Sequence, residues 1–106
     1  MLKIKNDKIN QLEKYGFKKE RWGYIFYPSN NSPETRYFSS IKIDYCDDKD
    51  SWLNRAIMFD LNNMSVYSND LEQLDLDFQN LQYSYNEFKK KIDELKNADL
   101  IEKIED

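Results

Sequence analysis

Carboxylates are the residues of this chain whose type and spacing come closest to a reactive or ligand-binding site. Four aspartates, Asp44, Asp47, Asp48 and Asp50, fall within seven residues. Ca²⁺ and Mg²⁺ prefer oxygen ligands on a flexible loop, but an EF-hand loop also needs a glycine at its turn and a closing glutamate. Because both are missing, we interpret the segment as a solvated turn, expect no metal, and regard an anionic contact patch as its functional alternative.

Covalent and acid–base catalysis lack their usual residues. The sequence contains no histidine, one cysteine and two glycines. Histidine is the commonest general base and metal ligand, and glycine-rich turns present nucleophiles or cradle phosphates. Carboxylate pairs can hydrolyse glycosides, but they need a cleft that a domain of this size seldom builds. The sequence therefore predicts a protein that is not an enzyme and uses no cofactor.

Charge is distributed unevenly along the chain, whose net charge is −4. Residues 1–21 carry seven Lys or Arg and three Asp or Glu, a net of +4, so the remainder has a net of −8. Such a chain is a poor general binder of nucleic acid and is better suited to a basic protein surface. The candidate partner-binding residues are two acidic clusters and two aromatic anchors: Asp44, Asp47, Asp48, Asp50, Asp70, Glu72, Asp75, Asp77, Trp52 and Tyr67.

The basic N-terminal segment offers an alternative site. Lys18, Lys19 and Arg21 precede Trp22 within five residues. Single-strand nucleic-acid binders combine cations that contact phosphate with aromatic rings that stack on bases. A small regulator that binds nucleic acid through these four residues is thus a second hypothesis, although a short run of cations is usually only solvated.

Cysteine usage and hydropathy indicate the compartment. The single Cys46 cannot form an internal disulfide, which fits a reducing environment. The first residues lack the apolar segment of a signal peptide, and no apolar run approaches the roughly 18 residues of a membrane span. We expect a cytoplasmic protein that does not contact a membrane.

The pattern of apolar residues predicts the elements that position these side chains. Residues 7–15 have helical spacing and end at a glycine. Alternating or aromatic stretches predict strands over residues 22–27, 36–45 and 55–61. The dipeptide Asn62-Asn63 predicts a tight hairpin turn into a fourth strand, residues 64–67.

A long amphipathic stretch covers residues 70–97. Its apolar residues recur at intervals of three and four, which predicts one helix, or two with a break near residues 75–77. The apolar stripe either covers the sheet or joins two copies of the chain as a coiled coil, so the protein is a monomer or a homodimer. Asp99 with Glu102 matches a capping box and predicts a final helical turn.

The order of these elements predicts the fold class. A chain of 106 residues allows one domain with a single core. We expect a single α+β domain over residues 1–106, with an antiparallel meander of about four strands. A short N-terminal helix and a long C-terminal amphipathic helix would pack on one face of that sheet.

Three segments carry a resemblance to a known group of proteins. They are Leu12-Glu-Lys-Tyr-Gly-Phe17, the aromatic stretch Trp22–Tyr27 and the hairpin sequence Phe59-Asp-Leu-Asn-Asn-Met-Ser-Val66. In texture the chain is similar to the small proteins that phages and other mobile elements of AT-rich Gram-positive bacteria carry, a pool that includes anti-CRISPR proteins. The resemblance implies a short, acidic inhibitor without catalytic machinery, and it assigns no functional residue.

The leading hypothesis is therefore a non-enzymatic inhibitor that occupies the surface of a host protein or ribonucleoprotein, such as a CRISPR effector nuclease. Such effectors hold nucleic acid in positively charged channels, where an acidic and aromatic patch can take the place of phosphates. A toxin-neutralising immunity protein has the same composition and stays open as an alternative.

Overall fold

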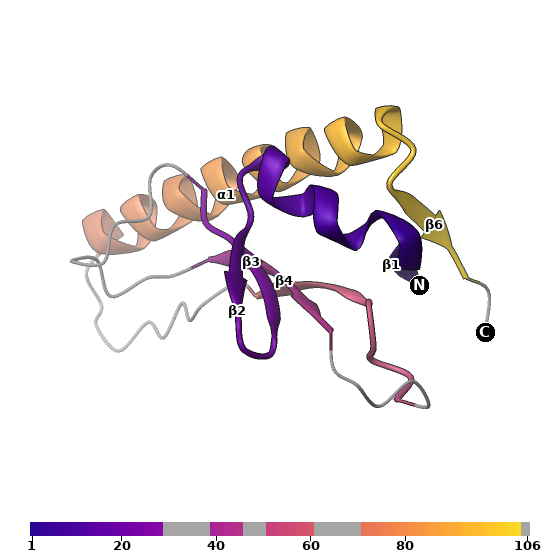
Figure 1. Cartoon of the computed structure of the whole chain (residues 1–106). Helices are drawn as coiled ribbons and strands as arrows, with labels where there is room; N and C mark the ends of the chain where they lie inside the picture. The colour runs from indigo at the N-terminus through magenta and orange to yellow at the C-terminus, as the bar shows by residue number, and fades with distance from the viewer. Residues whose placement is uncertain (29–38, 46–50, 61–70, 105–106) are drawn as a thin grey trace.

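The computed structural model describes residues 1–28, 39–45, 51–60 and 71–104, except for the side chains of residues 71–77 and 80 (Figure 1). A four-stranded antiparallel sheet forms its centre, in the order β2-β3-β4-β5. The strands are β2 (Lys18–Glu20), β3 (Gly23–Phe26), β4 (Ser40–Asp44) and β5 (Ile57–Asp60).

A second, two-stranded sheet joins the two ends of the described chain. Strand β1 (Leu2–Ile4) pairs antiparallel with β6 (Ile101–Lys103), with Ile4 opposite Ile101. An isolated bridge between Lys3 and Ala56 links this small sheet to the start of β5. Neither strand is predicted from the sequence, because each is only three residues long and its partner lies about 100 residues away along the chain.

Two helices complete the fold: the 3-10 helix η1 (Asn6–Tyr15) and the α-helix α1 (Leu71–Asn97). Both end in the same way. The amide of Phe17 donates to the carbonyl of Leu12 at 3.2 Å, and the amide of Leu100 donates to the carbonyl of Leu95 at 3.0 Å. These are the 6→1 bonds of Schellman motifs, whose C′ residues adopt the left-handed conformation. Gly16 has that conformation with φ 88° and Asp99 with φ 60°.

The helices cover one face of the large sheet, as Figure 1 shows. Side chains from both helices and from both sheets form one apolar cluster. Its fully buried members are Ile4, Leu12, Ile41, Ile43, Leu95 and Leu100. Burial of such side chains contributes roughly 1.5–3 kcal/mol each, so this shared cluster holds the two sheets and two helices together.

The α+β class, two helices and a four-stranded antiparallel sheet are confirmed. The membership of the sheet differs in part from the prediction, because β2 is one of its strands and residues 64–67 lie outside the described residues. The helical turn predicted from Asp99 and Glu102 is wrong. Asp99 instead ends α1, and the chain turns into strand β6.

Candidate binding surface

Strand register divides the large sheet into two faces with different roles. On the inner face, Tyr24 lies opposite Ile43, which lies opposite Ile57. Next to them, Ile41 lies between Phe26 and Phe59. Phe59 also meets Phe88 of α1 with ring centroids 5.5 Å apart. This face therefore packs against the helices.

The outer face presents the other half of the alternation. Lys42 lies between Ile25 and Met58, and Ser40 lies opposite Asp60. A hollow of about 340 Å³ opens on this face. We call it the outer hollow and define it by its lining residues: Glu20, Trp22, Ile25, Tyr27, Ser40, Lys42 and Asp60.

Two of the residues that line the outer hollow are exposed aromatics, and two others are buried. Trp22 and Tyr27 are 39% and 45% exposed, whereas Ile25 and Ser40 are buried. Trp22 and Tyr27 precede and follow β3, so one short strand holds both rings. Gly23 permits the close approach of β3 to β4, since a Cβ at this position would collide with the carbonyl oxygen of Ile43. The backbone geometry of β3 thus sets the positions from which both aromatic side chains extend.

Mixed charges line the outer hollow. Lys42 Nζ donates to Asp60 Oδ2 at 2.9 Å, from one strand to the next. Lys18 Nζ lies 3.6 Å from Glu20 Oε1 on β2. Both pairs are exposed to solvent, so each contributes no more than about 1 kcal/mol to stability. Their main effect is to give the surface a defined pattern of positive and negative groups.

The structure describes only part of the predicted acidic and aromatic site. Asp44 is half-buried at the end of β4, on the outer face, and Trp52 is exposed on the turn before β5. The backbone of α1 includes Glu72, Asp75 and Asp77. The remaining candidates, Asp47, Asp48, Asp50, Tyr67 and Asp70, lie outside the described residues. The structure therefore brings Asp44 to the same face as the outer hollow and leaves the grouping of the other acids a prediction.

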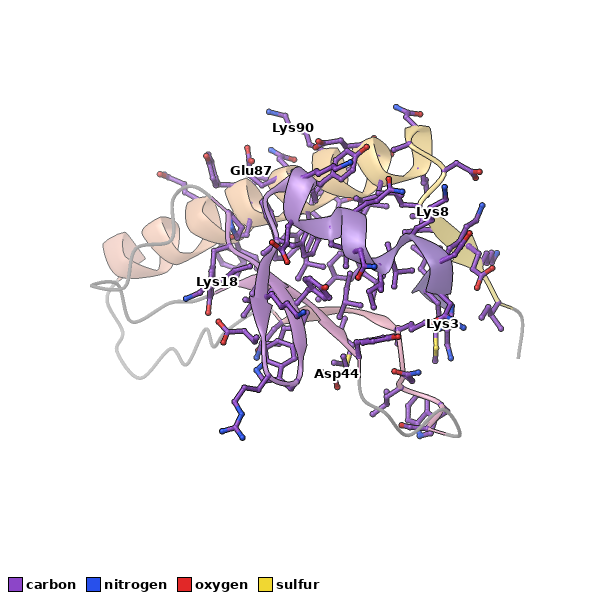
Figure 2. The ribbon with its side chains drawn as sticks, viewed as in Figure 1. Lys3, Lys8, Lys18, Asp44, Glu87 and Lys90 are labelled. Atoms are coloured by element: carbon purple, nitrogen blue, oxygen red, sulfur yellow. The ribbon has the colours of Figure 1, made fainter. Side chains whose placement is uncertain are left out.

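The basic segment is split between the two faces of the sheet. Lys18 lies opposite Ile25 on the outer face, whereas Lys19 lies opposite Tyr24 on the inner face. Arg21 and Trp22 form the exposed turn between β2 and β3. Figure 2 shows Lys18 and Asp44 well apart on the sheet. The consecutive cations predicted as one phosphate-binding patch thus do not share a single surface.

Sequence reasoning did not find Lys42 or Asp60 as site residues. Only strand register brings Lys42 of β4 and Asp60 of β5 together, and register cannot be read from either strand alone.

The segment from Ser39 to Lys42 has the Ser-x-x-Lys spacing of some hydrolases. Side chains three positions apart on an extended chain point to opposite faces, so Ser39 and Lys42 do not meet as that mechanism requires.

Among the described residues, no group of three or more His, Cys, Asp or Glu side chains is placed to hold a metal ion. No helix in the same part of the chain has the length and apolar character needed to cross a membrane.

Comparison with known proteins found no family model, no curated protein and no solved structure that matches this chain.

Proposed function

We propose that this chain is a non-enzymatic protein-binding module that contacts its partner through the outer hollow. The single observation that carries the proposal is the arrangement of Trp22 and Tyr27 around the Lys42–Asp60 pair. Tyr and Trp are enriched at the centres of protein interfaces, because they bury a large area with few rotatable bonds. An oriented pair of opposite charges between them supplies specificity.

Two features favour a protein partner over nucleic acid. Lys42 is paired with Asp60 inside the outer hollow, and Lys18, which is not part of its lining, is paired with Glu20. The outer hollow therefore presents little uncompensated positive charge. Affinity for nucleic acid comes largely from cations that replace the counterions of phosphates. A mixed and aromatic surface is instead typical of protein interfaces, whose rims are polar.

Within this function, we propose an inhibitor of a host protein or ribonucleoprotein with a basic surface, of the kind that phages carry against CRISPR effectors, acting in the host cytoplasm. The support is the net charge of −8 after residue 21 and the place of Asp44 on the same face as the outer hollow. Carboxylates beside an aromatic anchor can occupy a channel that normally holds phosphates.

The test is a pull-down from a bacterial host lysate with the tagged chain, at low and at high salt. Bound proteins and bound nucleic acid are both identified. We expect one protein to be retained by the native chain and lost from the double variant Trp22→Ala/Tyr27→Ala. Tyr83→Ala is the matched control, because Tyr83 is a large exposed aromatic of α1 outside the outer hollow.

The outcomes separate the parts of this proposal. Equal retention by the double variant would contradict the outer hollow as the contact surface. Retention that does not change with salt would contradict the basic-surface partner but leave an aromatic interface. Recovery of nucleic acid without protein would favour the regulator that uses the basic segment. Circular dichroism of each variant checks that the fold is unchanged.

A further inference from the structure

The outer hollow is lined by two carboxylates, Glu20 and Asp60, and one ammonium group, Lys42. Lys42 Nζ donates to Asp60 Oδ2 at 2.9 Å, so these two charges offset each other. Glu20 has a weaker partner, because Lys18 Nζ lies 3.6 Å from Glu20 Oε1, which is too far for a hydrogen bond. Lys18 and Arg21 do not line the outer hollow. The lining thus has a net charge of −1, and the carboxylate that carries it is Glu20.

Another carboxylate borders the same end of the outer hollow. Gly23 of β3 lies opposite Glu20 of β2 on one side and opposite Asp44 of β4 on the other. Residues that lie opposite each other point to the same face of a sheet, so Glu20 and Asp44 share the outer face, two strand spacings or about 10 Å apart. Figure 2 shows Asp44 on the side of the sheet away from the helices. Because Gly23 has no side chain, no side chain of β3 stands between the two carboxylates.

Trp22 adds an aromatic ring at this end of the outer hollow. It is 39% exposed and lies in the turn between β2 and β3, directly before Gly23. The amide of Tyr45 donates to the carbonyl of Trp22 at 2.9 Å, which holds the backbone of this turn against the end of β4. Further along the same lining, Ile25 is apolar and buried. One hairpin thus presents an aromatic ring, an apolar surface and a carboxylate side by side.

We propose that the outer hollow binds an arginine side chain of the partner, with the guanidinium group between Trp22 and Glu20. This inference rests on the proposed function and names the group of the partner that the surface holds. A guanidinium is planar, so it stacks on an indole ring while its N–H groups donate to carboxylates. The methylene stem of the arginine packs on Ile25. An ammonium lacks the planar face and is more strongly hydrated, and an anion would meet Glu20 and Asp44 with like charge.

The test is an NMR titration of the full, isotope-labelled chain with N-acetyl-arginine amide as the probe. We expect saturable changes in the signals of the Trp22 indole and the Gly23 amide, with a dissociation constant in the millimolar range. Trp52→Phe leaves one indole signal and so identifies that of Trp22. N-acetyl-citrulline amide, which has a similar shape without the charge, should bind about tenfold more weakly. N-acetyl-lysine amide, which has the charge without the planar group, should also bind more weakly.

Two variants test the residues that hold the guanidinium. Glu20→Gln keeps the size of the side chain but removes its charge, and it should weaken binding of the arginine probe by about tenfold. Glu13→Gln is the matched control, because Glu13 is an exposed carboxylate of η1 outside the outer hollow. Trp22→Ala should abolish the saturable change at the Gly23 amide. The dispersion of the amide signals shows whether each variant is folded.

The arginine site is overturned if the outer hollow shows no saturable change up to about 50 mM probe, a range that includes millimolar dissociation constants. Equal affinity for the citrulline or the lysine probe would also overturn it, as would equal affinity of Glu20→Gln and the native chain.

These failures differ from a failure of the proposed function. If the arginine probe does not bind but the lysate partner is lost from Trp22→Ala/Tyr27→Ala, the outer hollow remains the contact surface and this inference alone is wrong. If the arginine probe binds but that double variant retains the partner, the proposed contact surface is wrong and the arginine site stands.

Discussion

Arg55 and Ile4 are joined by two hydrogen bonds that run in opposite directions. The amide of Ile4 donates to the carbonyl of Arg55 at 3.0 Å, and Arg55 Nη1 donates to the carbonyl of Ile4 at 2.8 Å. The same guanidinium lies 3.3 Å from Glu102 Oε1, and the amide of Arg55 donates to the carbonyl of Asp44 at 2.6 Å. One residue thus connects β1, β6 and β4, which explains why the small sheet stays against the large one.

We predict that Arg55→Ala lowers the free energy of unfolding by about 1–3 kcal/mol, because it removes charge-assisted hydrogen bonds. Arg55 has a positive φ of 67°, so Arg55→Gly separates two causes. Glycine also lacks the guanidinium but tolerates this conformation, and it should be more stable than the alanine variant by about 1 kcal/mol. Urea unfolding measures both, and native-like stability of the alanine variant would contradict the structural role.

We predict that Gly23→Ala is among the most damaging small substitutions in the chain. The new methyl group would collide with the carbonyl oxygen of Ile43 and push β3 away from β4, at a cost of about 1–3 kcal/mol or more. Gly16→Ala is the control, because Gly16 also has a positive φ but its Cβ meets only ordinary contacts. It should cost about 1 kcal/mol. Thermal unfolding that ranks Gly16→Ala as the worse variant would refute this account.

Lys91 differs from its neighbours in the sequence Lys89-Lys90-Lys91, which reads as a solvated helix face. Its side chain is 14% exposed, donates to the carbonyl of Tyr15 at 2.7 Å and lies 4.8 Å from the centre of the Phe26 ring. Lys90 is 79% exposed and, as Figure 2 shows, lies on the side of α1 away from the sheet.

We predict that Lys91→Met lowers the free energy of unfolding by about 1–2 kcal/mol, since it leaves the last carbonyl of η1 without this donor and removes the cation from the ring. Lys90→Met, the same change at an exposed site, should stay within about 0.5 kcal/mol of the native chain. Denaturant unfolding of the two variants compares them directly. Equal effects would show that the buried position of Lys91 has no energetic role.

The ion pair between Lys5 and Asp99 predicts a pH dependence of stability. The hydrogen bond from Lys5 Nζ to Asp99 Oδ1, at 2.7 Å, lowers the pKa of Asp99 below its ordinary 3.8 and raises the pKa of Lys5 above its ordinary 10.5. A lowered carboxyl pKa stabilises the folded state above 3.8, and that contribution is lost as the pH falls through the lowered value. The contribution of Lys5 is lost only as the pH rises through its raised value.

We therefore expect Asp99→Asn to be less stable than the native chain at neutral pH. The difference should shrink as the pH falls through the lowered pKa of Asp99, because the native carboxylate then becomes neutral as well. Asparagine tolerates the left-handed conformation of this position, so the substitution isolates the charge. Glu13→Gln, a change at an exposed carboxylate of η1, controls for the loss of one charge. A constant difference between Asp99→Asn and the native chain across this range would contradict the linkage.

Periodicity predicted the parts of the fold that a long apolar pattern determines. The alternation around Ile41 and Ile43, and the helical spacing that includes Phe88 and Leu95, correctly identified an α+β fold with these residues in its core. Strand β2 was missed because Lys18-Lys19-Glu20 contains no apolar residue, and its pairing comes only from its neighbour β3.

Other features needed spatial information that residue types do not contain. Asp99 and Glu102 have the spacing of a helix start, but the same aspartate serves as a left-handed helix end, and only the backbone of Leu95–Leu100 decides between them. Trp22 of the outer hollow could be identified by its type. Its companions Lys42 and Asp60 could not, because they meet through the register of two strands that are separated by a long connection.

The pairing of β1 with β6 delays the completion of the core while the chain is being synthesised. Strand β1 leaves the ribosome about 100 residues before its partner, which at about 5–20 residues per second is an interval of roughly 5–20 s. During that interval Ile4 lacks Leu100 and Ile101, with which it shares the apolar cluster. The nascent chain therefore cannot complete this apolar cluster until β6 emerges.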